Sequence, residues 1–284
     1  PIKDYDRDLD RLMTPRIVVD WETSNGSFEI ARDTFGDILE VRQKTQGWSS
    51  LGITREVVKL RGLMNLFNDF YENPDGLKAL LGFISNANMA KIDFLEKNNL
   101  LHLNNDGTYI GSGGYGYTDE LPKADFNGKV RTIDMWGFTE SQETINVSPE
   151  HYAEFVFPVE KPIMERFGLT CYGCCEELHT RWQVVKKHHQ LRRVSCSPWA
   201  DIEKMSTYLE DQFILSLKPL PTPLSFPKLD GKAVRQEIRK LLEMTGDNIV
   251  ELIMKDNHTI GNRPENVVEW CRIAKEEALR ISGL

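Results

Sequence analysis

The sequence predicts an α/β protein and, more narrowly, a single-domain (β/α)8 TIM barrel over residues 1–284. Short apolar runs rich in β-branched residues alternate with longer amphipathic segments, a pattern typical of βαβ units and a parallel sheet. The apolar runs number about eight, which favours a closed barrel over an open sheet. The length also fits one large core, and no repeat or linker divides the chain. Because the chain begins at Pro1 instead of Met, truncation of the N-terminal part is left open.

The first half is expected to hold strand-like runs, two helices and a glycine-rich bend. Asn73-Pro74-Asp75 predicts a helix start, since Asn favours the N-cap and Pro the first helical position. Gly111–Gly116 lacks the Lys-Ser/Thr of a phosphate loop and the dinucleotide spacing, so we interpret it as a bend at a strand end. The helices are expected at 56–70 and 73–98, and the strand-like apolar runs at 16–20, 100–103 and 130–135.

The second half alternates more regularly. Ser148, Pro149 and Glu150 predict a helix start, with Ser as the N-cap and an acid in the first turn, and Gly168 ends that helix. Strands are expected at 169–171, 193–196, 213–217 and 249–254. Helices are expected at 148–167, 178–188, from 201 onward, 231–244 and 263–281.

The composition argues against several classes of function. The chain carries 35 basic and 43 acidic side chains, a net charge of −8, which disfavours binding to a nucleic-acid backbone. No apolar run is long enough to cross a bilayer and no signal-peptide core is visible, so we expect no membrane partner. Five cysteines are too few for a disulfide framework at this length. We therefore expect reduced thiols and a cytoplasmic protein.

In a TIM barrel the active site lies at the carboxyl ends of the strands. The segment from Trp136 to Glu140, with Gln142 close by, suits the wall of a substrate pocket, as does Trp199. An aromatic belt with exposed acids is the alternative for the first of these segments. The residues expected at strand ends are Asp20, Trp136, Glu140, Cys171, Cys174, Cys196, Lys218, Lys255, Asp256 and His258.

The strongest chemical signal is a cluster after one expected strand, made of Cys171, Cys174, Cys175, Glu176 and His179. Thiolates at short spacing can converge on a soft cation such as zinc. A structural zinc site usually has a second Cys/His pair, so an open site with His258 as a remote ligand fits better. The alternatives are reduced thiols buried at the barrel rim, a redox role for Cys171 and Cys174, and an ordinary loop hydrogen bond for His258.

The other histidines and the last cysteine are expected to be structural. Cys271 lies among apolar residues of the terminal helix and is expected in the core. His188 and His189 fall in a basic run and are expected at a solvated helix end. His102 and His151 are expected to have structural roles.

The second half of the chain resembles the uroporphyrinogen decarboxylase superfamily, which includes the decarboxylase and the corrinoid- and cobalamin-linked methyltransferases. The Ser148-Pro-Glu150 helix, with Tyr152 in it, is similar to the family's Ser-Pro helix. The strand at 169–171 falls where the methyltransferases carry a His-x-Cys-Gly zinc motif, and Pro264-Glu-Asn-Val267 resembles the start of the family's last helix. Lys218-Pro219 matches a further family position only loosely. The decarboxylase's arginine-rich N-terminal motif and a literal His-x-Cys are both absent.

The resemblance implies a (β/α)8 barrel and a metal-dependent methyltransferase. Zinc held by Cys171, Cys174 or Cys175, and His258 would bind and activate a small-molecule thiol acceptor. The methyl donor would be a corrinoid or cobalamin on a partner protein. Expected acid–base or supporting residues are Glu140, Glu176, His179 and Asp256. Expected substrate- or cofactor-binding residues are Asp20, Trp136, Gln142, Tyr172, Trp199 and Lys218.

Two other functions stay open at this point. One is a metal-free carboxy-lyase acting on a tetrapyrrole or a small carboxylic acid, with Asp20, Lys218 or His258 stabilising or protonating a carbanion. The other is a barrel that binds a corrinoid or tetrapyrrole without transforming it. Formation of a homo-oligomer stays open for all three functions.

Overall fold

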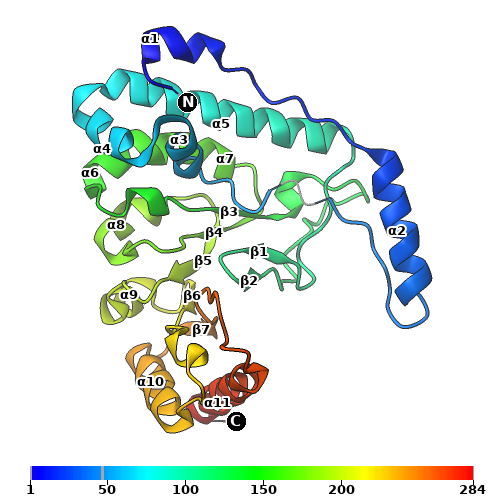
Figure 1. The fold of residues 1–284 in the computed structure, drawn as a ribbon, viewed down its shortest axis with the longest axis vertical. Helices are drawn as coiled ribbons and strands as arrows, with labels where there is room; N and C mark the ends of the chain where they lie inside the picture. The colour runs from blue at the N-terminus through cyan, green and yellow to red at the C-terminus, as the bar shows by residue number, and fades with distance from the viewer. Residues whose placement is uncertain (1, 46–47, 284) are drawn as a thin grey trace.

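The computed structural model describes residues 2–45 and 48–283, and a five-stranded parallel sheet lies at its centre (Figure 1). The strands are β3 (Trp136–Thr139), β4 (Leu169–Tyr172), β5 (Leu191–Cys196), β6 (Ile214–Leu217) and β7 (Ile249–Leu252). Each strand pairs with the next one along the chain, in the order β3-β4-β5-β6-β7. The α/β class and the parallel sheet are therefore confirmed.

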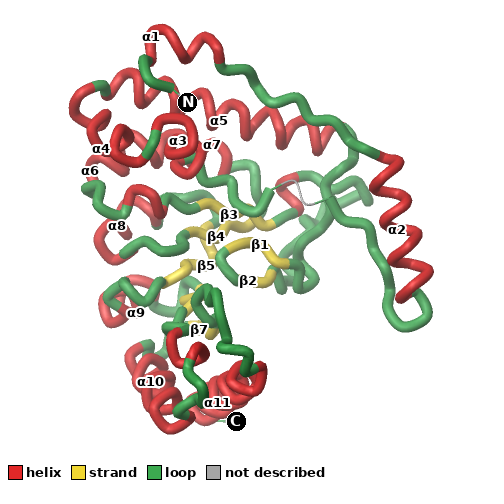
Figure 2. The backbone as a smooth tube through the Cα atoms, in the orientation of Figure 1, coloured by secondary structure: helices red, strands yellow, loops and turns green. Residues whose placement is uncertain are grey.

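Helices connect consecutive strands, as Figure 2 shows. The connection from β3 to β4 is α6 (Pro149–His151), a π-helical turn η4 (Tyr152–Val156) and α7 (Phe157–Met164). The later helices are α8 (Leu178–Val185), α9 (Ile202–Leu209), η5 (Thr222–Ser225), α10 (Gly231–Met244) and α11 (Pro264–Ser282). The elements expected for the second half are all present, and the helix predicted at 231–244 matches α10 at both ends.

The alternation of side chains along the strands gives the sheet two faces. Phe138, Cys171 and Arg193 are aligned across three strands and share one face. This face is covered by the antiparallel hairpin of β1 (Tyr109–Gly111) and β2 (Gly114–Tyr115). A Cβ at Gly111 would overlap the Phe138 ring, and Arg193 donates to the Tyr115 carbonyl at 2.7 Å. The glycine-rich segment is thus a hairpin bend that packs directly on the sheet.

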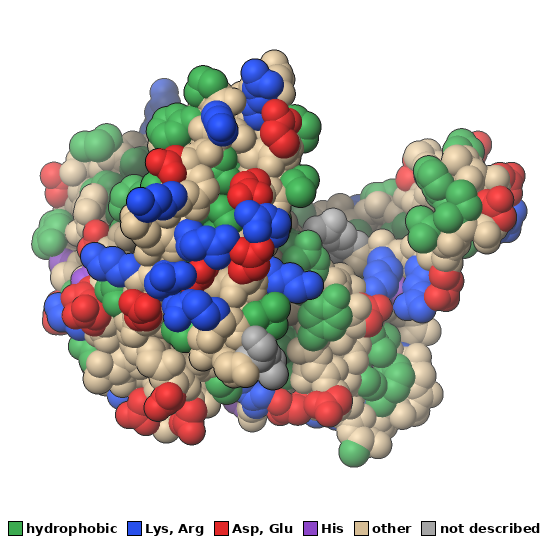
Figure 3. Space-filling view, turned by 90° about the horizontal axis from the view of Figure 1, so that it is seen from below, with side chains coloured by type: hydrophobic (Ala, Val, Ile, Leu, Met, Phe, Trp, Pro, Cys, Tyr) green, Lys and Arg blue, Asp and Glu red, His purple; other side chains and the backbone are tan. Residues whose placement is uncertain are grey.

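The first half forms a helical layer and a projecting arm. The layer consists of α1 (Tyr5–Asp8), η1 (Leu9–Arg11), α3 (Thr54–Arg61), α4 (Leu63–Glu72) and α5 (Pro74–Lys97). The Asn73 side chain accepts the Gly76 N–H at 3.0 Å, which confirms the predicted start of α5. The extended segment 12–20 runs alongside α5 and leads to α2 (Trp21–Phe35) (Figure 1). No residue of α2 is buried, and Figure 3 shows this helix standing away from the body.

Two strand predictions in the first half are wrong, because these apolar runs do not pair with other strands. Residues 16–20 and 100–103 form no strand. Val18 is 76% exposed, and the Asp20 carboxylate instead accepts the Thr23 N–H at 3.0 Å and so begins α2.

Two further boundaries are displaced for local reasons. The strand expected at 130–135 begins at Trp136, because the Asp134 carboxylate accepts the backbone N–H groups of Lys123 and Arg131 and fixes a 3-10 turn, η2 (Thr132–Asp134). The single helix expected at 56–70 is two helices, broken where Gly62 adopts a φ of 89°.

Within the described residues, β3 and β7 are the outer strands of the sheet, and closure into an eight-stranded barrel stays a prediction.

The face made by α10 and α11 carries interspersed acids and bases, with ion pairs such as Arg239–Glu277 at 2.9 Å and Arg272–Glu269 at 2.6 Å (Figure 3). Among the helices formed by residues 2–45 and 48–283, none combines the length and the apolar character needed to cross a membrane.

Candidate active site

Polar groups follow the carboxyl ends of the parallel strands, at one edge of the sheet. The loop after β4 is the most densely built of these ends, because Gly173, with a φ of 102°, turns the chain tightly against Leu178 and the Ser195 carbonyl. The titratable residues at this edge include Glu140, Cys174, Cys175, Glu176, Lys218 and Lys255.

Glu176 holds two of these loops together. Its carboxylate is fully buried and accepts the Ser141 N–H at 2.5 Å and the Cys174 N–H at 2.6 Å. Its own carbonyl accepts the Ser197 hydroxyl at 3.1 Å. Both carboxylate oxygens thus accept hydrogen bonds from backbone N–H groups. Glu176, which was expected to be catalytic or supporting, therefore positions the loops that carry Ser141 and Cys174.

Cys174 and Cys175 place two thiols side by side, with their Sγ atoms 3.8 Å apart. The Lys255 ammonium lies 3.1 Å from the Cys175 Sγ. The hydrogen bond from the Cys174 thiol, together with this cation, lowers the pKa of Cys175 to about 6. The same contact with Cys175, reinforced by burial, raises the pKa of Cys174 well above its usual value. At neutral pH the pair therefore consists of one thiolate and one thiol.

Glu140, directly after β3, is a buried carboxyl group suited to proton transfer near pH 7. Burial, followed by the nearby charges of Glu176 and Glu143, raises the pKa of Glu140 to about 7. Its Oε1 accepts the Ser50 hydroxyl at 3.0 Å, and its Oε2 accepts the Gln142 N–H at 3.2 Å. A general acid or base works best with a pKa close to the operating pH.

The raised pKa of Glu140 predicts that the stability of the fold depends on pH. A group whose folded-state pKa is raised from 4.5 to about 7 destabilises the fold progressively as pH rises through that interval. Glu140→Gln removes the titration, so the variant should gain about 3 kcal/mol relative to wild type between pH 4 and pH 8. Urea unfolding at both pH values measures the change, with the exposed Glu177→Gln as control. Equal pH dependence of wild type and Glu140→Gln would contradict the assignment.

Lys218, after β6, is bound to the tip of the hairpin. Its ammonium donates to the Ser112 hydroxyl at 2.8 Å and to the Ser112 carbonyl, and the Ser112 and Ser195 hydroxyls are 3.0 Å apart. Burial lowers the pKa of Lys218. Trp136 was expected to line a substrate pocket, but it lies within β3, 2% exposed, beneath the Arg193 guanidinium.

The four expected metal ligands lie in different surroundings. Cys171 is fully buried in an apolar group with Phe138 and Leu169, and burial raises the pKa of Cys171 to about 12. His258 is exposed in the loop after β7. Only Cys174 and Cys175 touch each other, and among residues 2–45 and 48–283 no three His, Cys, Asp or Glu side chains group as a metal site.

The remaining expected site residues lie apart from the thiol pair or have other partners. His179 accepts the Asp201 N–H at 3.1 Å through its Nδ1, and Tyr172 stacks on the His188 ring on the far face of the sheet. Trp199 and Asp256 are exposed, with Asp256 3.2 Å from the Lys255 ammonium.

Two structural predictions were wrong. Cys271 is exposed instead of lying in the core. His188 is buried instead of solvated, in a polar group where the Tyr152 hydroxyl lies 3.3 Å from its Nε2 and 3.0 Å from Glu160. Burial lowers the pKa of His188 to about 3 and raises the pKa of Glu160 well above its usual range.

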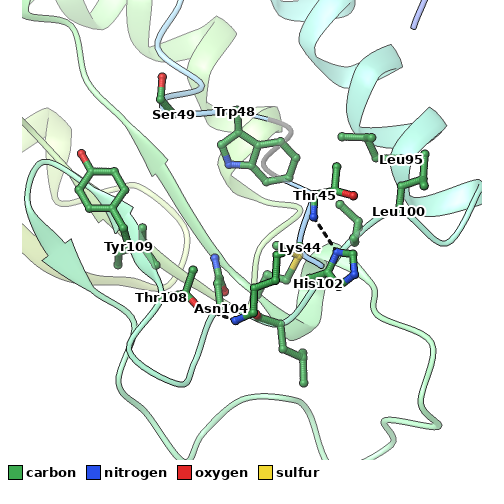
Figure 4. A pocket seen from close by; sticks show the side chains of 14 residues that line it. Lys44, Thr45, Trp48, Ser49, Leu95, Leu100, His102, Asn104, Thr108 and Tyr109 are labelled. Carbon is green, nitrogen blue, oxygen red and sulfur yellow. Dashed lines mark hydrogen bonds between the residues drawn. The ribbon is translucent and has the colours of Figure 1, made fainter. Parts of the chain in front are cut away.

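A separate cavity of about 220 Å³ lies between the end of α5 and the hairpin (Figure 4). His102 lies in its wall and accepts the Thr45 N–H at 3.0 Å through its Nδ1. In the view of Figure 4, Tyr109 lies across from His102, and Trp48 lies between them. Among residues 2–45 and 48–283, no thiol or carboxylate lines this cavity, so these residues add no reactive group to the strand-end site.

The sequence did not predict two of the contacts in this site. Lys255 was expected at a strand end but not as a partner of a thiol, and Ser50 was not among the expected site residues. Both act through contacts between distant segments, 80 residues apart for Lys255 and Cys175 and 90 for Ser50 and Glu140. In comparisons with known proteins, no family model and no curated protein matches this chain.

Proposed function

We propose that this chain is a methyltransferase-type enzyme similar to the uroporphyrinogen decarboxylase superfamily, with Cys174 and Cys175 as two ligands of a catalytic zinc ion. The separation of the two sulfur atoms is the observation that carries the proposal. Two thiolates bound at about 2.3 Å to one tetrahedral zinc lie about 3.8 Å apart. The Sγ–Sγ distance is 3.8 Å. The pair therefore fits the metal, whereas Cys171 and His258 are no longer part of the proposed ligand set.

Bound zinc would lower the pKa of an acceptor thiol, so that its nucleophilic thiolate forms near neutral pH. The Lys255 ammonium, 3.1 Å from Cys175, offsets the negative charge that two thiolates bring to one place. Glu140, with a pKa of about 7, takes up the proton that the acceptor releases. Glu176 fixes the Cys174 backbone and so the spacing of the two sulfur atoms. The methyl donor is a corrinoid on a partner protein.

The metal content of the purified protein tests the ligand pair. Wild-type protein should retain about one zinc per chain after dialysis; a catalytic zinc has three protein ligands, so the two thiolates supply all but one of them. Cys174→Ser and Cys175→Ser should each lose most of it, whereas Cys271→Ser, which removes an exposed thiol elsewhere, should retain it. Elemental analysis of the three variants decides the matter. Zinc that is absent from wild type, or unaffected by both substitutions, overturns the proposal.

A metal-free carboxy-lyase is the second candidate, and the two lysines at the strand ends favour it. Lys218 and Lys255 could together hold a substrate carboxylate, with Glu140 as the proton donor to the product carbanion. Carbon dioxide release by chelator-treated protein supports the lyase, whereas methylation of added 2-mercaptoethanol by methylcobalamin supports the methyltransferase. Corrinoid binding without either reaction would identify a non-catalytic corrinoid-binding protein.

A further inference from the structure

Two cavities lie under the extended segment 12–20, where it runs alongside α5. The larger has a volume of about 570 Å³ and lies between this segment, α3 and α5. The smaller, of about 310 Å³, lies on the α2 side. Ile17 and Lys91 line both cavities, so they mark the boundary between the two. Pockets that hold small organic ligands are typically about 300–1,000 Å³.

The walls of the larger cavity are mainly apolar. Its apolar lining includes Leu12, Ile17, Leu60, Phe83, Ile84 and Ala87. A cavity of this size with such walls favours an aliphatic chain or a ring, because burying apolar surface contributes about 25 cal/mol per Å².

The charged groups of the larger cavity leave one surplus cation. Lys59 and Glu56 neutralise each other in an ion pair of 2.7 Å. The third charged group, Lys91, is half-buried on α5, and within residues 2–45 and 48–283 its ammonium makes no hydrogen bond or ion pair. In the smaller cavity, Asp20 is occupied by the Thr23 N–H and hydroxyl at 3.0 and 2.8 Å. Burial lowers the pKa of Lys91, and the nearby charge of Glu56, which is paired with Lys59, offsets this only in part.

The larger cavity also reaches the strand-end site. Ser50 and Gly52 line the cavity, and the Ser50 hydroxyl donates to the Glu140 carboxyl at 3.0 Å. A Cβ placed on Gly52 would lie 2.6 Å from the same Glu140 oxygen. The absence of a side chain at Gly52 therefore allows Glu140 to lie directly behind the cavity wall. A ligand in the cavity would therefore lie one residue away from the carboxyl group that we place in proton transfer.

We propose that the cavity between segment 12–17, α3 and α5 binds a small amphipathic carboxylate, with its apolar body along the walls and its carboxylate on Lys91. One surplus positive charge matches a monoanion, whereas a phosphate dianion would bring excess negative charge into a mainly apolar space. The proposal goes beyond the zinc site and does not depend on it.

Titration calorimetry of the full chain with decanoate tests the site, with decanol as the uncharged probe of equal length. Decanoate should bind, and Lys91→Met should weaken it by about tenfold, the effect of losing one partly buried ion pair. The same variant should leave decanol binding within about twofold. Lys59→Met is the matched control, because Lys59 lines the same cavity but is already paired with Glu56. Equal losses in the two variants, or no decanoate binding by wild type, overturn the proposal.

A second variant locates the ligand. Ala87→Phe fills the cavity from α5 and should abolish binding of both decanoate and decanol without changing the zinc content. Binding that persists in this variant places the ligand elsewhere and overturns the proposal. Circular dichroism on each variant identifies loss of folding, and Lys91→Arg, which keeps the charge, should retain decanoate binding where Lys91→Met does not.

Discussion

Replacing Glu176 by alanine is expected to lower the free energy of unfolding by about 2–5 kcal/mol. The substitution leaves the N–H groups of buried Ser141 and half-buried Cys174 without this acceptor, and a buried donor without a partner costs about 1–3 kcal/mol. It also opens a cavity where a fully buried side chain lay. Denaturant unfolding measures the loss.

The neighbouring Glu177→Ala is the matched control, because Glu177 has the same charge but is exposed. It should change stability by less than about 0.5 kcal/mol. A second readout separates positioning from general stability: at a temperature where Glu176→Ala is still folded, its zinc content should fall while that of Glu177→Ala stays at the wild-type value. Retention of full zinc by the folded Glu176→Ala protein would show that Glu176 does not fix the spacing of the thiols.

The order of elements in the second half could be predicted because each boundary is encoded locally. The Ser148 hydroxyl accepts the His151 N–H and the Asp230 carboxylate accepts the Ala233 N–H, so both helices begin at residues whose side chains favour an N-cap. Because a helix separates each apolar β-branched run from the next, these runs pair with one another as parallel strands. The failures in the first half have the opposite cause. Ile17, Val18 and Val19 have the composition of a strand, but in the part of the chain that the structure describes no strand lies beside them. Composition alone does not show whether a partner strand is present.

From the sequence, the location of the site at the carboxyl ends of the strands could be predicted, but not which of its side chains are in contact. Placing Glu140, Cys174, Cys175 and Lys218 at one edge follows from the parallel order of the strands. Which thiols meet does not follow, because residues along a strand alternate between faces and the following loop turns at Gly173. Cys171 therefore packs in an apolar group while Cys174 and Cys175 meet. The pairing of Cys175 with Lys255 depends on the register between distant strands, which no local pattern encodes.

In metal-free protein, Cys175 is expected to be alkylated by iodoacetamide with a pH midpoint near 6. Alkylation follows the thiolate fraction, so the rate should be nearly constant from pH 7 to 8 and should fall as pH decreases through 6. Lys255→Met removes the ammonium 3.1 Å from the sulfur atom, so the midpoint should move upward and the rate at pH 6.5 should fall several-fold.

The other thiols supply the controls for this experiment. Cys175→Ser should abolish the component with a midpoint near 6, whereas Cys271→Ser, which lacks only an exposed thiol, should leave it in place. Cys171 and Cys196 are fully buried with pKa values raised to about 12, so they should react only after unfolding. Because folding lowers the pKa of Cys175, this thiolate stabilises the fold at pH 8 and loses that contribution as pH falls towards 6. A midpoint near 8.5 in wild type, or one that Lys255→Met leaves unchanged, would show that Lys255 does not stabilise the thiolate.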